Sequence, residues 1–381
     1  MKIIMLGAGI VGLCAANLLA QDADLNIVLI DGKEPNLSWE ESTYDLRCSA
    51  ISRAAENLFI NLGVWQDIIA TRAGVYEQMI IWQNEIGSAL SFKAQEIQEP
   101  NLGYIIENRV IQAALWQRLQ KFNNVNTQFL NFDHLSLEAL RLDADLIIGA
   151  DGAASWLRTV SNIPTLRWSH NQSALTATIK SEYAHQNIAR QKFGDHGPLA
   201  FLPLAETNLS SIVWTADPAR ISRLNKISST EFCQELAASF DYALGDLELC
   251  GSRASFPLHM LHATRYIADK IALIGDAAHV VHPLAGQGMN LGIFDAATLA
   301  QVILAAKQSG RDISAQQVLR KYERERKGHN ISMLAMVELF KRNIGTQAIF
   351  LRAANKLSPL KNLMARFAMG LNSDFPVSLR T

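Results

Sequence analysis

The chain has 381 residues, which is enough for two or three domains. Hydrophobic residues make up 49% and charged residues 19%, so the composition is that of a globular protein and not of a disordered chain. The 35 lysine and arginine residues nearly balance the 36 acidic ones, which excludes the basic footprint of a nucleic-acid-binding protein. Four cysteines without a C-x-x-C pair or zinc-type spacing indicate neither a disulfide framework nor a structural zinc site, and fit a reducing cytoplasm.

The first 31 residues have the order strand, tight turn, helix, strand. Residues 3–6 are a short apolar run, the glycine-rich segment GAGIVG follows, and residues 13–20 have a helical pattern. A second strand-like run, residues 27–30, ends at Asp31. This order matches the dinucleotide-binding fingerprint G-x-G-x-x-G, with an acidic residue about 20 positions further on.

Each residue of this fingerprint has a mechanical role. Gly7 permits the sharp turn, Gly9 lets a pyrophosphate approach main-chain N–H groups, and Gly12 lets the helix lie close to the strand. Val11 is a further candidate contact within the same turn. Asp31 is expected to accept hydrogen bonds from a ribose and to repel a 2′-phosphate, which favours FAD or NAD over NADP. A glycine turn without a ligand is the alternative.

The same segment also imitates a signal peptide or a membrane span, because Met1 and Lys2 precede an uncharged run over residues 3–20. Its three glycines would weaken an isolated helix, and the fingerprint explains their spacing better. No other stretch of eighteen or more apolar residues is present, so we expect no spanning helix.

Residues 275–292, GDAAHVVHPLAGQGMNLG, are the second unusual segment. A strand-like run over residues 266–274 precedes them, so Asp276 is expected at the carboxyl edge of a strand, where open α/β sheets contact their ligands. After the Pro283 turn, the glycine-rich end of the segment leads into a predicted buried helix over residues 293–306. The start of this helix would also point at a ligand.

Two interpretations of this segment remain open from the residues alone. Asp276, His279 and His282 could bind a metal ion, but they would converge only on a continuous helix, which Pro283 and the nearby glycines oppose. A nucleotide site explains more: the acid would hold hydroxyls, the glycines would admit a flat ring, and the helix dipole would stabilise negative charge on that ring.

The segment GDAAHVVHPLAGQGMNLGIFDA closely resembles the second FAD motif of the aromatic-ring flavoprotein monooxygenases that share the p-hydroxybenzoate hydroxylase fold. Its core is most similar to the ubiquinone-biosynthesis hydroxylase branch. A further motif agrees, DLIIGADG at residues 145–152 with Ser155 and Arg158 after it. Shorter matches are YDLRCSA around Arg47, LGYIIENR around Asn108, and GPLAFLPL followed by SIVW within residues 197–214. The resemblance spans nearly the whole chain.

The resemblance implies a set of cofactor contacts. Asp276 would hold the ribityl chain of FAD, and Arg47 would lie beside the phosphate and ribityl region. Asn108 is a weaker match, for which a helix N-cap is the alternative. Asp151 and Arg158 would place FAD or the passing nicotinamide, or form a structural ion pair. Near Gly288 to Asn290, main-chain N–H groups would face the flavin's pyrimidine edge. The candidate cofactor-binding residues are Gly7, Gly9, Val11, Gly12, Asp31, Arg47, Asn108, Asp151, Asp276, Gly286, Gly288, Met289 and Asn290.

The resemblance also implies a reaction. NAD(P)H, bound transiently, would reduce FAD, O₂ would add to the reduced flavin, and the peroxyflavin would transfer an oxygen atom to the ring of a polyprenylated phenol in ubiquinone biosynthesis. The candidate catalytic residues are His282, as acceptor of the phenol proton, and Pro283, as a contact; a histidine that only shapes the turn is the alternative. Two other hypotheses are a same-fold hydroxylase of a small soluble aromatic compound and a non-catalytic FAD-binding component of a quinone-biosynthesis complex.

We therefore predict an α/β fold with a Rossmann-like FAD-binding domain assembled from residues 1–70, 97–165 and 262–330. Residues 71–96 and 166–261 alternate apolar and polar positions and are predicted to form an antiparallel-sheet substrate domain. Residues 331–381 are predicted to be a helical C-terminal region. Between Val125 and Asp145 the family usually has a longer strand-turn-strand excursion, so its small accessory sheet is in doubt here.

The C-terminal region is basic. Residues 331–370 contain Lys341, Arg342, Arg352, Lys356, Lys361 and Arg366, against one acid, Glu338. Interleaved apolar residues predict basic amphipathic helices that could lie on an anionic membrane surface, and a helical cap packed on the protein is the alternative. We expect a cytoplasmic protein in peripheral contact with the inner face of the membrane.

Overall fold

The computed structural model describes residues 1–40, 43–83, 89–194, 196–281, 287–344, 362–363, 365–367, 369–371 and 376–380. The strands of the described residues form three sheets, and the predicted α/β class is confirmed. The first sheet has the order β15-β16-β9-β1-β2-β8. In that order its strands are Ile267–Ala268, Ile271–Leu273, Leu146–Gly149, Lys2–Leu6, Asn26–Asp31 and Val125–Phe129.

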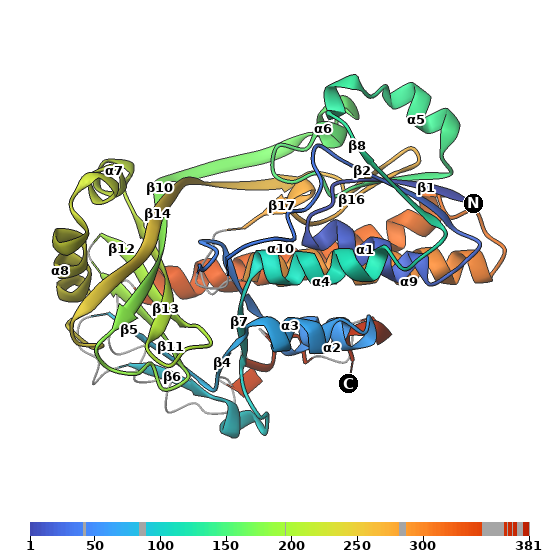
Figure 1. The fold of residues 1–381 in the computed structure, drawn as a ribbon. Helices are drawn as coiled ribbons and strands as arrows, with labels where there is room; N and C mark the ends of the chain where they lie inside the picture. The colour runs from blue at the N-terminus through green and yellow to red at the C-terminus, as the bar shows by residue number, and fades with distance from the viewer. Residues whose placement is uncertain are drawn as a thin grey trace.

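Neighbouring strands of the first sheet are parallel, except that β15 and β16 are antiparallel. Strands β1 and β2 are almost continuously apolar because helices and loops cover both faces of a parallel sheet. Helices α1 (Ile10–Ala20), α4 (Asn108–Leu119) and α9 (Gln287–Gln308) lie below it in Figure 1, with α10 (Gln316–Ile344) packed against α9.

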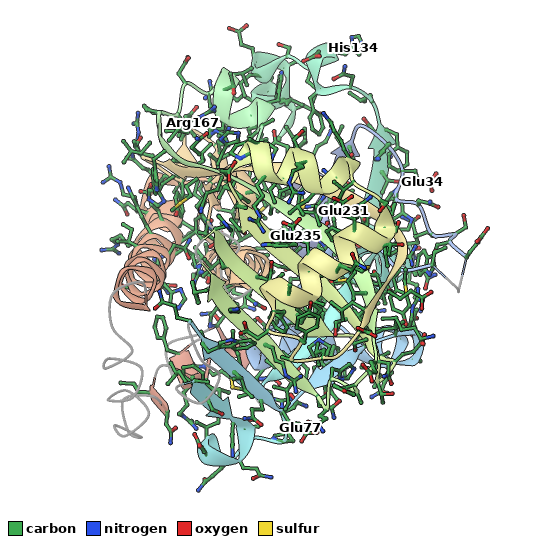
Figure 2. All side chains as sticks on the ribbon, turned by 90° about the vertical axis from the view of Figure 1, so that its left-hand side faces the viewer. Glu34, Glu77, His134, Arg167, Glu231 and Glu235 are labelled. Atoms are coloured by element: carbon green, nitrogen blue, oxygen red, sulfur yellow. The ribbon has the colours of Figure 1, made fainter. Side chains whose placement is uncertain are left out.

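The second sheet has the order β17-β14-β10-β13-β12-β11-β5-β6. In that order its strands are His279–Val280, Leu247–Ala263, Thr165–Ser181, Leu209–Ala216, Gly197–Pro203, Ile188–Gly194, Gln78–Trp82 and Leu90–Lys93. Neighbours are antiparallel as predicted, except that β11 and β5 run parallel. Helices α7 (Pro218–Lys226) and α8 (Ser229–Ser239) cover its outer face, where Figure 2 labels Glu231 and Glu235 of α8.

Strands β10 and β14 connect the two halves of the molecule. Each is seventeen residues long, and together they form a twisted ribbon that runs from the second sheet toward the first (Figure 1). Their register shifts between Ser169 and Ser173, and again between Ala177 and Thr178. Such irregularities bend a strand pair and increase its twist. The second sheet is thereby turned so that its inner face closes one side of the cavity described below.

A third, three-stranded sheet has the order β3-β7-β4, from Cys48–Ile51, Gly103–Glu107 and Gly74–Tyr76. Helices α2 (Arg53–Asn61) and α3 (Trp65–Thr71) follow β3, and a 3-10 turn, η2 (Ala94–Ile97), precedes β7. Strand β4 falls in the segment 71–96 that was predicted for the substrate domain, yet it pairs with β7. That predicted segment therefore divides between two sheets.

The structure adds detail to three local features of the sequence. The run over residues 266–274 is a hairpin of β15 and β16 and not one strand, because Lys270 turns the chain with φ 54°. The shortened connection from β8 to β9 forms a 3-10 turn, η3 (Phe132–His134), and helix α5 (Leu137–Asp143). Helix α10 runs without a break across residue 330, where the sequence predicts the start of the C-terminal region.

One described segment, Gly288–Gln308 of α9, is long and apolar enough to cross a membrane by length and composition alone. Most of it is buried inside the protein against α1 and α10. Its apolar character is thus accounted for by the core that it fills.

Candidate functional site

A single cavity of about 480 Å³ extends from the glycine-rich turn at the start of α1 to the inner face of the second sheet. Gly9 and Val11 line it at one side, Asp276, Gly288 and Met289 at another, and residues of β10 to β13 close the far wall. The two glycine-containing helix starts that the sequence singled out therefore share one cavity. Its volume is in the range of small-molecule and cofactor sites.

The three glycines of the fingerprint meet different surroundings. A Cβ atom at Gly7, whose φ is 105°, would lie 2.3 Å from the Ala150 carbonyl oxygen, and one at Gly12 would lie 2.0 Å from the carbonyl oxygen of Gly7. Both positions are therefore fixed by packing. A Cβ atom at Gly9 would meet nothing within 4 Å, so this residue presents open backbone to the cavity.

Val11 holds the two helix starts together. A Cβ atom at Gly292 of α9 would lie 2.6 Å from Val11 Cγ2, and one at Gly275, whose φ is 59°, would lie 3.1 Å from Val11 Cγ1. Glycine is required at both positions for the valine to fit. The start of α1, the turn that carries Asp276 and the start of α9 are thereby locked together beside the cavity.

Asp276 lies in a 3-10 turn, η4 (Gly275–Ala277), directly after β16, at the predicted carboxyl edge of a strand. Its side chain is exposed to the cavity and forms no hydrogen bond within the described part of the chain. Desolvation raises its pKa, while the positive charges of His279 and Arg47 oppose that rise. A free carboxylate in this position fits a ligand that offers hydroxyl groups, such as the ribityl chain of FAD.

Arg47 and Asn108 line the same cavity from the opposite wall. Asn108 is the first residue of α4, and Glu107 occupies the N-cap position, so the alternative that Asn108 caps the helix is wrong. Its Oδ1 atom instead accepts a hydrogen bond of 2.7 Å from Ser49 Oγ. Arg47 is exposed, and its backbone carbonyl accepts the Asn108 N–H group, which ties the two predicted contacts together.

Asp31 and Asn290 do not line the cavity. Asp31 Oδ2 accepts a hydrogen bond of 2.5 Å from the Ala8 N–H group, which steadies the glycine turn. The buried Asn290 side chain donates to the Ala50 carbonyl oxygen at 2.8 Å and accepts from the Ser52 N–H group at 3.0 Å, so it fastens α9 to β3. Their predicted cofactor contacts stay predictions, and the Asn290 side chain is already engaged by these two hydrogen bonds.

Asp151 and Arg158 do not form the ion pair that was one alternative. Arg158 is buried and donates to the carbonyl oxygens of Ala277, at 2.9 Å, and Ala153, at 2.8 Å. Asp151 Oδ2 accepts the Leu157 N–H group, and among the residues described here Oδ1 has no hydrogen-bond partner. Arg158 therefore positions the turn that carries Asp276, because it binds the carbonyl of the next residue.

His282, Pro283 and Gly286 lie outside the described residues, so the structure does not test the predicted catalytic pair. The metal alternative required Asp276 and His279 on a continuous helix. Instead, Asp276 lies in the η4 turn and His279 in β17, with the His279 Nε2 atom bound to Asp295 Oδ2 at 2.6 Å. The continuous helix that would have joined Asp276 to His279 is therefore not formed, and His282 lies outside the described residues.

Comparison with known proteins agrees with this geometry. Residues 1–336 match the family described as the FAD binding domain. The chain belongs to this family. FAD is thus the cofactor of this protein, and the predicted resemblance to the FAD-dependent aromatic monooxygenases is confirmed.

Relatives within this FAD-binding family cover nearly the whole chain. A 3-demethoxyubiquinol 3-hydroxylase from Escherichia coli strain K12 is 35% identical over 97% of this chain and 98% of its own. A mitochondrial ubiquinone biosynthesis monooxygenase from Danio rerio is 33% identical over 96% and 89%. The structure of p-nitrophenol 4-monooxygenase from Pseudomonas putida has a TM-score of 0.74 at 16% identity, over 96% of this chain and 98% of that one, which supports the fold alone.

A buried polar network next to the FAD motif was missed by sequence reasoning. Asp295 of α9 accepts hydrogen bonds from the Gly275 N–H group at 3.0 Å, from His279 and from Arg326 Nε at 2.7 Å. Asn330 completes the network from α10. The available signal was an acid inside an otherwise apolar helix pattern, since such an acid is buried only when it is paired.

Proposed function

We propose that this FAD-dependent monooxygenase hydroxylates the aromatic ring of a polyprenylated phenol in ubiquinone biosynthesis. The observation that carries the proposal is the continuous cavity, which joins the FAD motifs around Gly9 and Asp276 to an apolar wall on the second sheet. Relatives named as ubiquinone-biosynthesis hydroxylases, at 33 to 35% identity over nearly the full length, support the same reaction class.

The far wall of the cavity favours a neutral ring. Its side chains are mostly small or apolar, among them Ala189, Ala200 and Val213. Within the described lining the cations are Arg47 and Arg190. Arg47 lies within electrostatic reach of Asp276, and Arg190 Nη1 donates to the carbonyl oxygens of His185 and Ile188. The cation of this wall, Arg190, is thus partly committed to the backbone, whereas a neutral phenol needs no countercharge there.

When bound, FAD would accept electrons from NAD(P)H and activate O₂. The protein's own tasks are to hold the cofactor and to orient the ring. Gly9 would admit the pyrophosphate, Asp276 would bind ribityl hydroxyls, and the apolar wall would exclude water, whose entry leads to release of hydrogen peroxide instead of ring hydroxylation.

The proposal is tested with purified holoenzyme, NADH or NADPH, and a short-chain prenylated phenol under isotopically labelled O₂. Incorporation of one labelled oxygen atom into the ring, detected by mass spectrometry, is the expected result. In cells, deletion of the gene should accumulate a quinone precursor that lacks one hydroxyl group. A purified protein that retains FAD but oxidises no NAD(P)H with any phenol would instead support a non-catalytic component of a quinone-biosynthesis complex.

We further propose peripheral attachment to a membrane. Residues 331–370 have six basic residues and one acid in their sequence, interleaved with apolar ones. Such a segment binds anionic lipid surfaces through charge and apolar burial together. Co-sedimentation with anionic but not with neutral vesicles is expected, and equal recovery from both would contradict the charge-based attachment.

A further inference from the structure

Gln191 occupies a distinct position on the inner wall of the cavity. Strand pairing places it in one row with Ala200 of β12, Val213 of β13 and Thr176 of β10. Directly opposed residues of paired strands have their side chains on the same face. All four residues line the cavity, so Gln191 faces it from the β11 end of the row.

The surroundings of Gln191 on this face are apolar. Along β11 its same-face neighbours are Ala189 and Phe193. Across the strands it lies between Ala200 on β12 and Ile81 on β5. None of these four side chains can form a hydrogen bond with an amide.

The Gln191 amide is also without a partner. The residue is only 5% exposed, and its side chain forms no hydrogen bond with any residue that the structure describes. Other amides of the lining are used: Gln112 Nε2 donates to the Ala8 carbonyl oxygen at 2.8 Å, and Asn108 accepts from Ser49. Neither amide atom belongs to the fully buried unpaired atoms of the described chain, so the amide is open to the cavity, where a ligand can become its partner.

We propose that Gln191 binds the ring oxygen of the substrate and so orients the ring toward the flavin, an inference that rests on the proposed function. A glutamine amide can accept a hydrogen bond from a phenol hydroxyl and can donate one to a phenolate. The Gln191 amide can therefore keep a hydrogen bond to the ring oxygen before and after the phenol loses its proton. Being neutral, it offers no countercharge to a carboxylate, which selects phenols over aromatic acids.

The apolar neighbours make this contact directional. Because Ala189, Ala200, Ile81 and Phe193 offer no competing polar group, the ring oxygen has one position on this part of the wall. The rest of the ring then packs against the flat surface of small side chains. The strand pairing spaces Gln191 and Thr176 three strands apart, about 14 Å. A single ring cannot reach both side chains, so Gln191 and Thr176 cannot bind two substituents of the same ring.

The test compares two probes on the purified holoenzyme: a short-chain prenylated phenol and the prenylated benzene that lacks the hydroxyl. Binding is measured by calorimetry, without turnover. The wild-type protein is expected to bind the phenol about tenfold more tightly than the benzene. In Gln191→Leu this preference should fall to about one, because affinity for the benzene stays and affinity for the phenol drops.

Stability and coupling give two further readouts. Removing an unpaired buried amide should leave the Tm of Gln191→Leu unchanged or raised, whereas a structural glutamine would lose stability. With NAD(P)H and O₂ the variant should release a larger share of peroxide per NAD(P)H consumed, since the ring is no longer held in place. Gln191→Met serves as a second variant if the leucine protein folds poorly. Gln234→Leu, on the exposed side of α8, makes the same chemical change away from the cavity.

The outcomes separate the two proposals. If the wild-type protein hydroxylates phenols and Gln191→Leu keeps both the tenfold preference and the wild-type share of peroxide, the role of Gln191 is wrong and the proposed function stands. If the wild-type protein binds neither probe and hydroxylates no phenol, the proposed function fails, and the role of Gln191 fails with it.

Discussion

Asp295 Oδ2 lies 2.6 Å from His279 Nε2, and both side chains are almost completely buried. Asp295 belongs to α9, while His279 follows Asp276 by three positions in the neighbouring strand β17. The pair therefore fixes the FAD motif to the helix whose start lines the cavity. Burial by itself would raise the pKa of Asp295, but His279 and Arg326 lower it to about 2.

Replacing Asp295 with asparagine should destabilise the protein by about 3–5 kcal/mol, because the amide lacks the negative charge that compensates the buried Arg326. Loss of FAD should accompany the lowered Tm, since Asp295 also holds the Gly275 N–H group of the cofactor turn. Chemical denaturation and the flavin absorbance of the purified protein measure the two effects. Asp269→Asn, an exposed position between β15 and β16, is the matched control. An Asp295→Asn protein with the wild-type denaturation midpoint would contradict a structural role for the network.

His262 gives a prediction on acid sensitivity. Burial, aided by the charges of His279 and Lys327, lowers the pKa of His262 to about 4, from 6.5 in an unfolded chain. Between these two pH values the unfolded chain binds the proton and the folded protein does not. Stability is therefore retained above pH 6.5 and declines as the pH falls toward 4, by up to about 1.4 kcal/mol per pH unit.

Unfolding midpoints measured from pH 7.5 down to about pH 4.5 should show this decline, and His262→Gln should make it shallower. His134→Gln is the control, because His134 is exposed, as its position in Figure 2 shows. Equal slopes for the wild-type protein and His262→Gln would mean that another group sets the acid sensitivity.

Alanine substitutions of the fingerprint glycines should separate effects on cofactor binding from effects on folding. Gly9→Ala has open space for its Cβ atom and a φ of −70°, which alanine adopts readily. The variant should keep the Tm of the apoprotein and lose FAD severalfold, as measured by the ratio of flavin to protein absorbance. Gly12→Ala must displace the Gly7 carbonyl oxygen, so it should lower the Tm even without FAD. A Gly9→Ala protein with full FAD content would remove the case for a pyrophosphate at this turn.

Asp276→Ala should weaken FAD binding by about 1–3 kcal/mol, or roughly fivefold to 150-fold, if the carboxylate holds ribityl hydroxyls. The apoprotein should be no less stable than the wild type, because Asp276 makes no hydrogen bond in the described chain and desolvation beside the cavity already disfavours its charge. Titration of apoprotein with FAD, followed by fluorescence quenching, measures the affinity. Unchanged affinity would place the ribityl chain elsewhere.

The N-terminal unit and the position of Asp276 could be predicted from sequence because local patterns determine them. The apolar runs, the glycine spacing and the acid at the end of β2 all act within about thirty residues. The pairing of β4 with β7 could not be read in this way, because a three-residue strand joins whichever edge tertiary packing offers.

The inner wall was beyond sequence reasoning for a different reason. Gln191 alternates with Arg190 and Lys192, so the pattern shows a half-buried strand but not which face meets the cavity. The face is decided by the register with β12, which is set by contacts between residues distant in sequence. Arg158 was likewise assigned to the cofactor or an ion pair, and only the fold reveals that it binds carbonyl oxygens.

The cavity lining begins at Gly9 and is completed only by Met289 of α9. The ribosome must therefore synthesise the greater part of the chain before the FAD site is complete. A product truncated before α9 would lack FAD and its colour. The apolar surfaces of α1 and the first sheet would then be exposed to water and proteases. Complete FAD binding therefore requires that translation has passed the start of α9.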